Sequence, residues 1–316
     1  MNITPDLSAI TDQTGRFTAF RAALDLRMRR HLVAPSEAPA HLMAASGAAI
    51  LSQGKRMRPY LVALAAEGAG NSEAILDAGC ALEMVHSASL ILDDLPCMDD
   101  AQLRRNQPAT HMEYGEATAM LAAVGLLSQA FGILAALPAS DAQRVALVAT
   151  MNRAVGWAGL VGGQEYDVNG FAPEDQTDGS ALGRIARVNR MKTGILLVAA
   201  VEMGAILGGQ STERRLSLAR FAEDMGQAFQ IADDLGDQLG TADTMGKDVG
   251  KDAGKTTFVA ELGTDMALRR CLELLRSAQA ALDTAGIDAE PFEWLIDQIF
   301  DRDRLAAQAD CHAEAS

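Results

Sequence analysis

Aromatic residues, prolines and cysteines are scarce in this chain, and each scarcity excludes a class of structure. Aromatics make up 4% of the 316 residues while hydrophobic residues make up 49%, so Ala, Leu, Val, Ile and Met must supply most of the core. Strands are usually rich in aromatic and β-branched residues, whereas Ala, Leu and Met are good helix formers. Only nine prolines interrupt the sequence, which leaves room for long helices. The composition predicts an all-α fold.

The four cysteines lack the spacing of a metal site or a disulfide framework. Cys80, Cys97, Cys271 and Cys311 are far apart or isolated, and no CxxC pair occurs. Reduced thiols in a cytoplasm are the simplest interpretation. The first residues, MNITPDLSAITDQTGRF, have no basic stretch followed by an apolar one, so we expect no signal peptide. The protein is predicted to be cytoplasmic.

Positive charge is also in short supply. The chain has 27 Lys and Arg residues against 42 Asp and Glu residues, for a formal net charge of −15. Such an acidic chain is not expected to bind nucleic acid or anionic membrane surfaces. If the substrate is an anion, the few cations must gather around it.

Residues 117–140 carry no charge, which is long enough to span a bilayer. The segment contains Ser128, Gln129 and Pro138, and it lacks the basic and aromatic flanks of a membrane span. We favour a helix buried on all sides, and we do not expect an integral membrane protein.

Helical patterns cover most of the chain, and no Pro/Gly/Ser-rich linker or repeat divides it. Turn residues bound the predicted helices, as Asn71 and Ser72 do by capping the fourth. Residues 169–179 form a polar loop, and strand-like alternation is absent. One domain over 1–316 is expected, with flexible ends at 1–15 and 309–316. The predicted helices are 16–32, 39–53, 57–69, 73–95, 109–137, 141–168, 180–208, 211–238, 264–284 and 289–308.

An acidic cluster follows an apolar helical run at residues 93–100, DDLPCMDD. On a straight helix Asp93 and Asp99 would lie about 240° apart, on different faces. Pro96 disfavours helix at Leu95 and removes an N–H donor, so the helix should open there. The chain can then fold back and bring Asp99 towards Asp93. Mg²⁺ usually takes one or two such carboxylates together with substrate phosphates.

A second acidic cluster, FQIADDLGD, covers residues 229–237. Asp233 and Asp237 are one turn apart on the same face of a predicted helix. A lone acidic pair is more often a solvated surface. Two such clusters, each after an apolar run and each close to Lys or Arg, instead point to a bound cation, because converging carboxylates repel one another.

The cations do gather near these clusters. A single basic pair is usually a solvated face. Next to acidic clusters, however, such pairs indicate a diphosphate site: the carboxylates bind a metal ion, the metal ion binds phosphate oxygens, and the Lys and Arg side chains neutralise the remaining negative charge. The basic groups are Lys55, Arg56 and Arg58, then Arg104 and Arg105, then Arg190 and Lys192, and finally Lys247, Lys251 and Lys255.

Together these motifs resemble the trans-isoprenyl diphosphate synthases, and among them the bacterial geranylgeranyl diphosphate synthases. The resemblance covers residues 40 to 262 and implies a bundle of about ten helices around a central active-site cavity, in a homodimer. It rests on GKRMRP (54–59), DDLPCMDD with LRRNQPATH (93–111), GLVGGQEYD (159–167), MKTG (191–194), FQIADDLGD (229–237) and GKDVGKDAGKTT (246–257).

The resemblance implies head-to-tail condensation of isopentenyl diphosphate with dimethylallyl, geranyl or farnesyl diphosphate. Asp93, Asp99 and Asp233 should ligate three Mg²⁺ ions that draw the diphosphate off the allylic substrate, with Asp94 and Lys192 completing the catalytic set. The leaving diphosphate should meet Arg104, Lys192, Thr193, Gln230, Lys247 and Lys255. Isopentenyl diphosphate should meet Lys55, Arg58, His86 and Arg105.

Two positions depart from the family pattern, where Gln53 and Asn106 replace glycines. Asn tolerates left-handed backbone best among the other residues, so the turn at Asn106 should persist. Without the resemblance, His86 would be read as an ordinary core histidine. Gln164 and Asp167 are as readily structural as functional.

Product length should depend on the residues four and five positions before Asp93. These are Ser89 and Ala88, about one helical turn deeper than the aspartate. Relatives that stop at fifteen carbons carry an aromatic at one of these places, whereas both residues are small here. We therefore expect geranylgeranyl diphosphate, with farnesyl diphosphate as the alternative.

Three other functions fit the motifs less well. A terpene cyclase would share the fold and the first acidic motif, but it has no use for a second diphosphate site formed by Lys55, Arg58 and Arg105. A head-to-head synthase is disfavoured for the same reason. A regulatory subunit without activity should have lost aspartates or basic residues, and none is missing.

Overall fold

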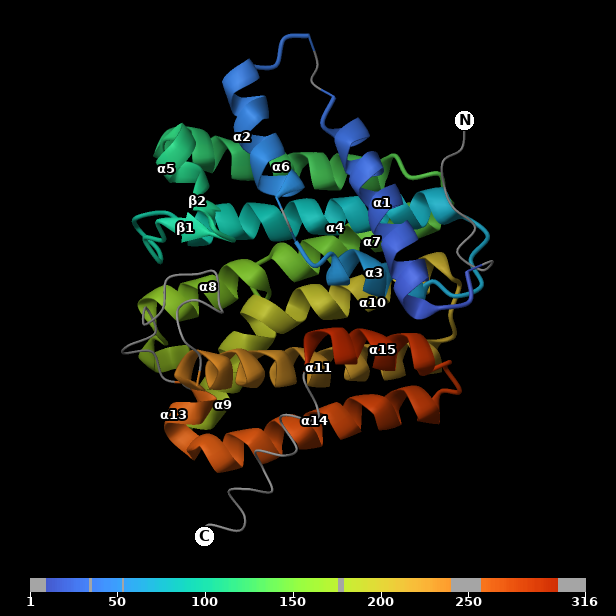
Figure 1. Cartoon of the computed structure of the whole chain (residues 1–316), viewed down its shortest axis with the longest axis vertical. Helices are drawn as coiled ribbons and strands as arrows, with labels where there is room; N and C mark the ends of the chain where they lie inside the picture. Colours follow the sequence, from blue (N-terminus) through green and yellow to red (C-terminus); the bar gives the residue numbers. More distant parts are fainter. Residues whose placement is uncertain (1–9, 34–35, 53, 176–178, 240–256, 301–316) are drawn as a thin grey trace. The chain divides into compact units, whose positions relative to one another are not determined.

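The computed structural model describes residues 10–33, 36–52, 54–175, 179–239 and 257–300 (Figure 1). These residues gather into two compact units. The first unit contains the described residues of 1–152 and 203–210, and the second contains those of 153–202, 211–244 and 257–300. Helices make up nearly all of the described regular structure, so the predicted all-α class is confirmed. A single polyprenyl synthase domain over the whole chain stays a prediction.

The first unit is built around one central helix. Helix α4 (Ser72–Asp93) packs against α6, α3, α1 and α2, and Figure 1 shows it flanked by α6 and α3. The Asn71 side chain accepts a hydrogen bond from the Ala74 N–H at 3.1 Å, so the predicted cap is confirmed. The other elements of this unit are α1 (Gln13–His31), α2 (Ala40–Leu51), α3 (Met57–Ala65), β1 (Leu103–Arg104), β2 (Gln107–Pro108), α5 (Thr110–Tyr114), α6 (Glu116–Ala135) and α7 (Asp141–Val155) up to residue 152.

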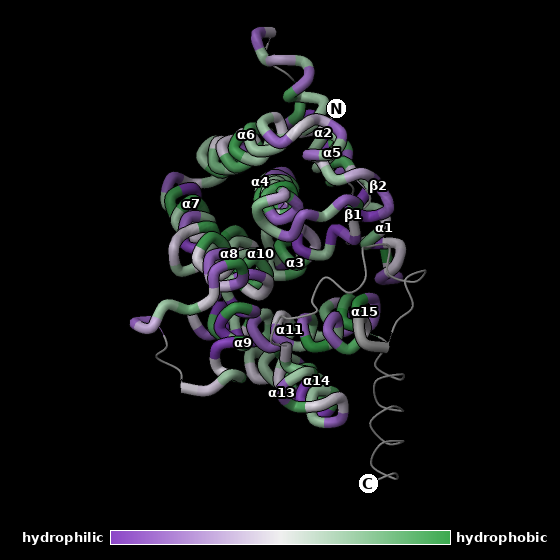
Figure 2. Tube along the Cα trace, turned by 90° about the vertical axis from the view of Figure 1, so that its left-hand side faces the viewer, coloured by the Kyte–Doolittle hydropathy of each residue, from purple (hydrophilic) through white to green (hydrophobic). Residues whose placement is uncertain are grey.

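The uncharged helix α6 is not buried on all sides in the single chain, so that prediction was wrong. One face packs on α4, whereas Met120, Leu121 and Val124 are 44%, 59% and 60% exposed. Figure 2 shows the hydrophobic colour along this helix. By length and composition alone, three described stretches could cross a membrane: α4, α6 and Asp141–Asn169.

The second unit has α11 (Thr212–Leu239) and α14 (Thr264–Thr284) packed along each other, as Figure 1 shows in yellow and orange. Phe221 of α11 meets Phe292 edge-on, with ring centroids 5.1 Å apart. The unit also contains α8 (Leu160–Asn169), the 3-10 turn η2 (Pro173–Asp175), α9 (Ala181–Asn189), the π-helix η3 (Arg190–Gly194), α10 (Ile195–Leu207) up to residue 202, α13 (Phe258–Leu262) and α15 (Glu290–Ile299).

Several predicted helices are divided in the structure, and glycines mark the breaks. The helix predicted at 109–137 breaks at Gly115, whose φ of 83° is left-handed. The helix predicted at 141–168 breaks before Gly159, where an added Cβ would lie 2.3 Å from the Ala154 carbonyl oxygen. The short hairpin β1–β2 was also missed, because two-residue strands are too brief to show alternation.

Candidate active site

The first acidic cluster forms a tight turn at the end of α4. The helix ends at Asp93, before Pro96, as predicted. The Asp99 N–H then donates to the Asp93 carbonyl at 3.0 Å, so the chain folds back and places the two aspartates on one turn. Asp100 closes the turn with a left-handed φ of 48°. The predicted reversal is confirmed.

Asp94 faces the protein rather than solvent. The residue is 2% exposed, and its carboxylate accepts a hydrogen bond from Arg104 Nε at 2.9 Å, while Arg104 Nη2 donates to the same oxygen. Burial raises the pKa of Asp94, and the hydrogen bonds from Arg104 oppose that rise. Asp94 and Arg104 therefore hold each other beside the turn that presents Asp93 and Asp99.

Arg104 and Arg105 reach different partners because a hairpin separates them. Strand β1 pairs with β2 through Arg104 and Gln107, and Arg105 and Asn106 form a two-residue loop with φ of 55° and 61°. Two left-handed residues are what a type I′ hairpin turn requires, so the prediction that Asn106 preserves the turn is confirmed. Arg105 Nη1 donates to Ser52 Oγ at 3.0 Å, away from Asp94.

A cluster of cations lies on the α3–α4 side of the first unit. Arg58 Nη1 is 3.4 Å from His86 Nε2, and the Arg58 Nε atom is buried with no hydrogen-bond partner in the described part of the chain. Burial lowers the pKa of His86 well below its ordinary value, and Arg58 and Arg105 add to this effect. Burial also lowers the pKa of Arg58 and of Arg105. Crowded cations with an unsatisfied donor are suited to an anion.

Lys55 belongs to the same motif, one residue before buried Arg56, and its side chain is exposed. The sequence therefore identified three members of this cluster, Arg58, His86 and Arg105, and the place of Lys55 beside them stays a prediction. It did not reveal that Arg56 is buried and paired with Glu83, since a residue's burial within a basic motif has no sequence signature.

In the second unit, Lys192 stands on the wide turn of the π-helix η3. Its Nζ lies 2.6 Å from Asp167 Oδ2 of α8. Thr193 Oγ1 donates to Gln230 Oε1 at 3.2 Å, and Gln230 Nε2 donates to Asp234 Oδ1 at 3.0 Å. The structure thus joins three of the sequence motifs into one polar chain. It also gives Asp167 a partner, although sequence reasoning left its role open.

Glycines allow the π-helix to fit between α8 and α11. A Cβ added at Gly163 would lie 2.7 Å from Lys192 N, and one added at Gly226 would lie 2.9 Å from Gly194 Cα. Both contacts are with backbone, which cannot swing aside as a flexible side chain can. π-helical turns occur often at functional sites. The close approach fixes the backbone that carries Lys192 and Thr193.

The second acidic cluster lies on the last turns of α11, where a helix was predicted. Asp233 is half-buried there, one turn after Gln230. The side chain of Asp237 lies outside the described residues, as do Gln53, Lys247 and Lys255. The predicted roles of these four residues stay predictions.

Within the described residues, no three or more His, Cys, Asp or Glu side chains form a metal-binding group. Such a group is not required for Mg²⁺, which is commonly held by one or two carboxylates, waters and substrate phosphates. Asp93 and Asp99, joined on one turn, supply oxygen donors of this kind. The donor chemistry therefore fits Mg²⁺ bound together with a diphosphate.

The two residues assigned to product length differ in their surroundings. Ala88 is fully buried within the first unit, whereas Ser89 is half-buried and donates from its Oγ to the His86 carbonyl at 2.8 Å. Ser89 is one turn from Asp93 on the same side of α4. Of the two, only Ser89 is partly exposed.

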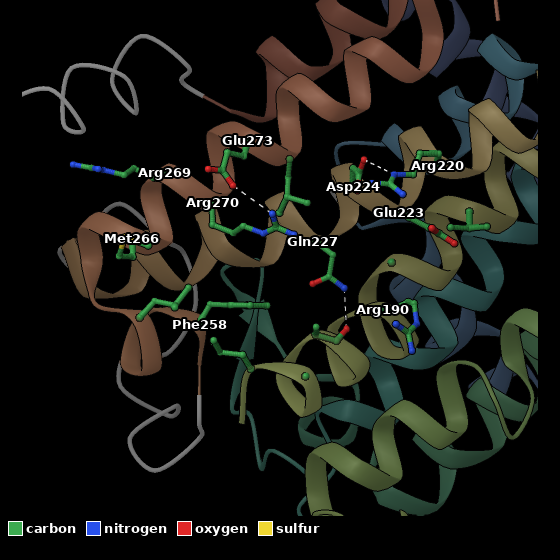
Figure 3. A pocket seen from close by; sticks show the side chains of 17 residues that line it. Arg190, Arg220, Glu223, Asp224, Gln227, Phe258, Met266, Arg269, Arg270 and Glu273 are labelled. Atoms are coloured by element: carbon green, nitrogen blue, oxygen red, sulfur yellow. Dashed lines mark hydrogen bonds and ion pairs between the residues drawn. The ribbon is translucent and has the colours of Figure 1, made fainter. Parts of the chain in front are cut away.

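A separate cavity of about 710 Å³ lies in the second unit, lined by residues of α9, α10, α11, α13 and α14. Figure 3 shows the side chains that line it. Its wall contains two ion pairs, Arg220 with Asp224 at 2.9 Å and Arg270 with Glu273 at 3.3 Å. Gln227 spans it and donates to the Ala186 carbonyl at 2.8 Å. Arg190, one of the basic residues named in the sequence analysis, lines this cavity, whereas the described residues assigned by resemblance to the metal or to the diphosphates do not.

The chain is similar to prenyl diphosphate synthases in both sequence and structure. A geranylgeranyl diphosphate synthase of Pseudescherichia vulneris is 45% identical over 75% of this chain and 76% of its own. A farnesyl diphosphate synthase of Escherichia coli is 39% identical over 79% of this chain and 86% of its own. The solved structure of a geranyltransferase from Helicobacter pylori, complexed with magnesium and isoprenyl diphosphate, superposes with a TM-score of 0.81 at 25% identity. It covers 92% of this chain and 98% of its own.

The family model of the polyprenyl synthetases matches residues 39–281. This span includes the turn at Asp93, the cations around Arg58, the π-helix with Lys192 and the aspartates of α11. The chain therefore belongs to the polyprenyl synthetase family and is a prenyltransferase of the isoprenyl diphosphate synthase type.

Proposed function

We propose that this prenyltransferase extends allylic diphosphates with isopentenyl diphosphate and releases geranylgeranyl diphosphate as its main product. The observation that carries the proposal is the pairing of two kinds of site within the first unit. One is an acidic turn with Asp93 and Asp99, and the other is a cation cluster around Arg58. A reaction between two diphosphates needs both, since one diphosphate must leave with metal assistance while the other stays bound.

The cation cluster is proposed to hold the diphosphate of isopentenyl diphosphate. Arg58 brings a buried donor, Arg105 adds a second guanidinium, and His86 stays neutral near pH 7 because burial and both arginines lower its pKa. A neutral imidazole can donate one hydrogen bond to a phosphate oxygen without increasing the repulsion among the cations. Lys55, exposed on the same motif, would close over the phosphate.

The aspartates are proposed to bind Mg²⁺ together with the allylic diphosphate. Asp93, Asp99 and Asp233 would supply the protein ligands, for three ions in all. When bound, Mg²⁺ neutralises the charge that develops on the departing diphosphate. Asp94 would keep Arg104 beside that diphosphate through the hydrogen bonds that the two side chains share.

Lys192, Thr193 and Gln230 are proposed to receive the leaving diphosphate, with Lys247 and Lys255. Asp167 holds Lys192 before substrate arrives, and Gln230 holds Thr193. The side chains therefore need little reorganisation when negative charge appears.

Bond changes in the proposed reaction balance without any redox partner. The allylic C–O bond breaks, and its electron pair leaves with the diphosphate. The double bond of isopentenyl diphosphate then forms the new C–C bond to the allylic carbon. Loss of one proton, taken up by the released diphosphate, restores a double bond. The protein contributes binding, orientation and exclusion of water.

A twenty-carbon product is proposed because Ala88 and Ser89 are both small. The relative from Pseudescherichia vulneris makes geranylgeranyl diphosphate by name, and the one from Escherichia coli makes farnesyl diphosphate. The fifteen-carbon product is therefore the second candidate, and it would require a barrier at a position other than Ser89.

A homodimer is proposed, with a second copy covering the exposed face of α6. Met120, Leu121 and Val124 lie on one side of a helix that has no charged residue after Glu116. Apolar faces of this kind are typical of subunit interfaces. With that face covered, α6 is an interior helix and no membrane insertion is required. The oligomeric state can be checked by analytical ultracentrifugation of the wild type and of Leu121→Lys, which should favour the monomer.

The condensation can be tested directly with the purified full chain. Labelled isopentenyl diphosphate is incubated with dimethylallyl, geranyl or farnesyl diphosphate, with Mg²⁺ or with EDTA. Incorporation of label into longer prenyl products should depend on both the primer and Mg²⁺. A cyclic product, or release of diphosphate without use of isopentenyl diphosphate, would instead support a terpene cyclase.

A further inference from the structure

Arg56 is the one arginine of the GKRMRP motif that faces inward. It precedes α3 with a left-handed φ of 53°, and its side chain is buried, with the residue 5% exposed. The neighbouring Lys55 is exposed, and Arg58 is half-buried beside His86. Left-handed backbone is unfavourable for a residue with a Cβ, and such strain is often found at functional sites.

All three guanidinium nitrogens of Arg56 already have protein partners. Nη1 donates to Glu83 Oε1 at 2.6 Å, and Nε donates to Asp25 Oδ1 at 3.3 Å. Nη2 donates to the carbonyl oxygens of Ile50 and Ser52 at 2.8 and 3.1 Å. These bonds use four of the five N–H donors of the guanidinium group, so Arg56 mainly holds the protein rather than a ligand.

Glu83, the closest partner, belongs to the helix that carries His86. It is 2% exposed and lies three residues before His86 on α4, hence on a neighbouring position of the same face. Its charge also acts on the cation cluster, since it favours the charged forms of Arg58 and Arg105. The pair therefore ties α4 to the segment that leads into α3.

The segment that leads into α3 also contacts Arg105. Arg56 binds the Ser52 carbonyl, and the Ser52 hydroxyl accepts from Arg105 Nη1 at 3.0 Å. Gly54 lies between the two guanidinium groups, where an added Cβ would be 2.9 Å from Arg105 Nη1 and 3.3 Å from Arg56 Nη1. Arg56 thus contacts, directly or through one residue, the elements that present every cation of the cluster.

We propose that Arg56 and Glu83 form a positioning pair for the isopentenyl diphosphate site. The pair does not touch substrate. It holds the segment before α3 against α4, so that Lys55, Arg58, His86 and Arg105 converge on one anion. The inference rests on the proposed assignment of that anion site.

The direction in which Glu83→Gln changes the KM for isopentenyl diphosphate separates a positioning role of Arg56 from direct binding of phosphate. Positioning predicts that Arg56→Met and Glu83→Gln each raise the KM for isopentenyl diphosphate, on the order of 10- to 100-fold, with smaller changes in kcat and in the allylic KM. If Arg56 instead bound phosphate, Glu83→Gln would release it and remove a nearby negative charge. The KM would then fall, and the proposal would be overturned.

Two further variants show whether a raised KM comes from lost positioning or from a general loss of stability. The double variant Arg56→Met with Glu83→Leu replaces a buried ion pair by apolar groups, which often restores stability. It should melt near the wild-type temperature and yet keep the raised KM. Asp77→Asn is the matched control, because Asp77 is another buried carboxylate of α4, held by Arg27 at 2.6 Å. It should lower the melting temperature and leave the KM unchanged.

The wild type and Lys55→Ala are measured alongside these variants. If Lys55→Ala leaves the KM for isopentenyl diphosphate unchanged, the anion-site assignment itself has failed. If Lys55→Ala raises that KM but a folded Arg56→Met does not, the positioning role alone is refuted. An equal rise in Asp77→Asn would mean that any loss of packing on α4 disturbs the site, and it too would refute the specific role.

Discussion

The close approach of α8 to the π-helix makes Gly163→Ala a sharp test of how Lys192 is positioned. The added Cβ would lie 2.7 Å from Lys192 N and 2.8 Å from Met191 C. Real Cβ contacts are essentially never shorter than 3.0 Å, and about 3.4 Å is ordinary, so the backbone at Lys192 must move by roughly 0.7 Å (3.4 − 2.7). Because the contact is with backbone, the shift carries the whole residue.

A displacement of that size affects both stability and chemistry. Overpacking in a filled core costs about 1–3 kcal/mol. The 2.6 Å contact between Lys192 and Asp167 and the 3.2 Å hydrogen bond between Thr193 and Gln230 would both be strained. A misplacement near 1 Å can lower the rate about 10²-fold, so we expect kcat to fall by between about 10- and 100-fold.

The assay compares thermal unfolding and steady-state turnover for Gly163→Ala and for Gly47→Ala. Gly47 is also helical, in α2, but nothing lies within 4 Å of its would-be Cβ. Gly47→Ala should therefore keep full activity and gain up to about 1 kcal/mol of stability. Wild-type kcat in a folded Gly163→Ala protein would refute the argument, as would an equal loss in Gly47→Ala.

Five other substitutions probe the remaining parts of the site. Asp93→Ala and Asp233→Ala should each lower turnover by about 10²-fold or more while circular dichroism stays helical; near-normal turnover in either would exclude that aspartate as a metal ligand. Arg58→Met should mainly raise the KM for isopentenyl diphosphate, whereas Arg104→Met should act on the allylic KM or on kcat; the reverse pattern would exchange the two diphosphate sites. Ser89→Phe should shorten the main product from twenty to fifteen carbons, as measured by chromatography of the dephosphorylated products, and an unchanged product would remove Ser89 from the tunnel wall.

Features with a local cause were predictable from the sequence. Pro96 ends α4 because its ring and missing N–H act on adjacent residues, and the reversal that follows brings Asp99 to Asp93. Asn106 preserves the hairpin because its backbone tolerance is intrinsic to the residue type. The cap at Asn71 has the same local origin.

Features that depend on tertiary packing were not predictable. The π-helix at Lys192 arises where Gly163 and Gly226 let two other helices reach its backbone, and no periodicity within residues 190–194 signals that. Arg56 looks like any other cation of its motif, and only the positions of Glu83 and Ile50 show that it faces inward. The exposed side of α6 was missed because an uncharged sequence does not show which side of a helix packs on the rest of the chain.

The length of the product is the most direct test of the proposed function. The wild-type chain, supplied with Mg²⁺, farnesyl diphosphate and labelled isopentenyl diphosphate, should yield labelled geranylgeraniol after phosphatase treatment, and dimethylallyl diphosphate should yield the same final product. Accumulation of farnesol from dimethylallyl diphosphate, with no extension of farnesyl diphosphate, would contradict the twenty-carbon assignment.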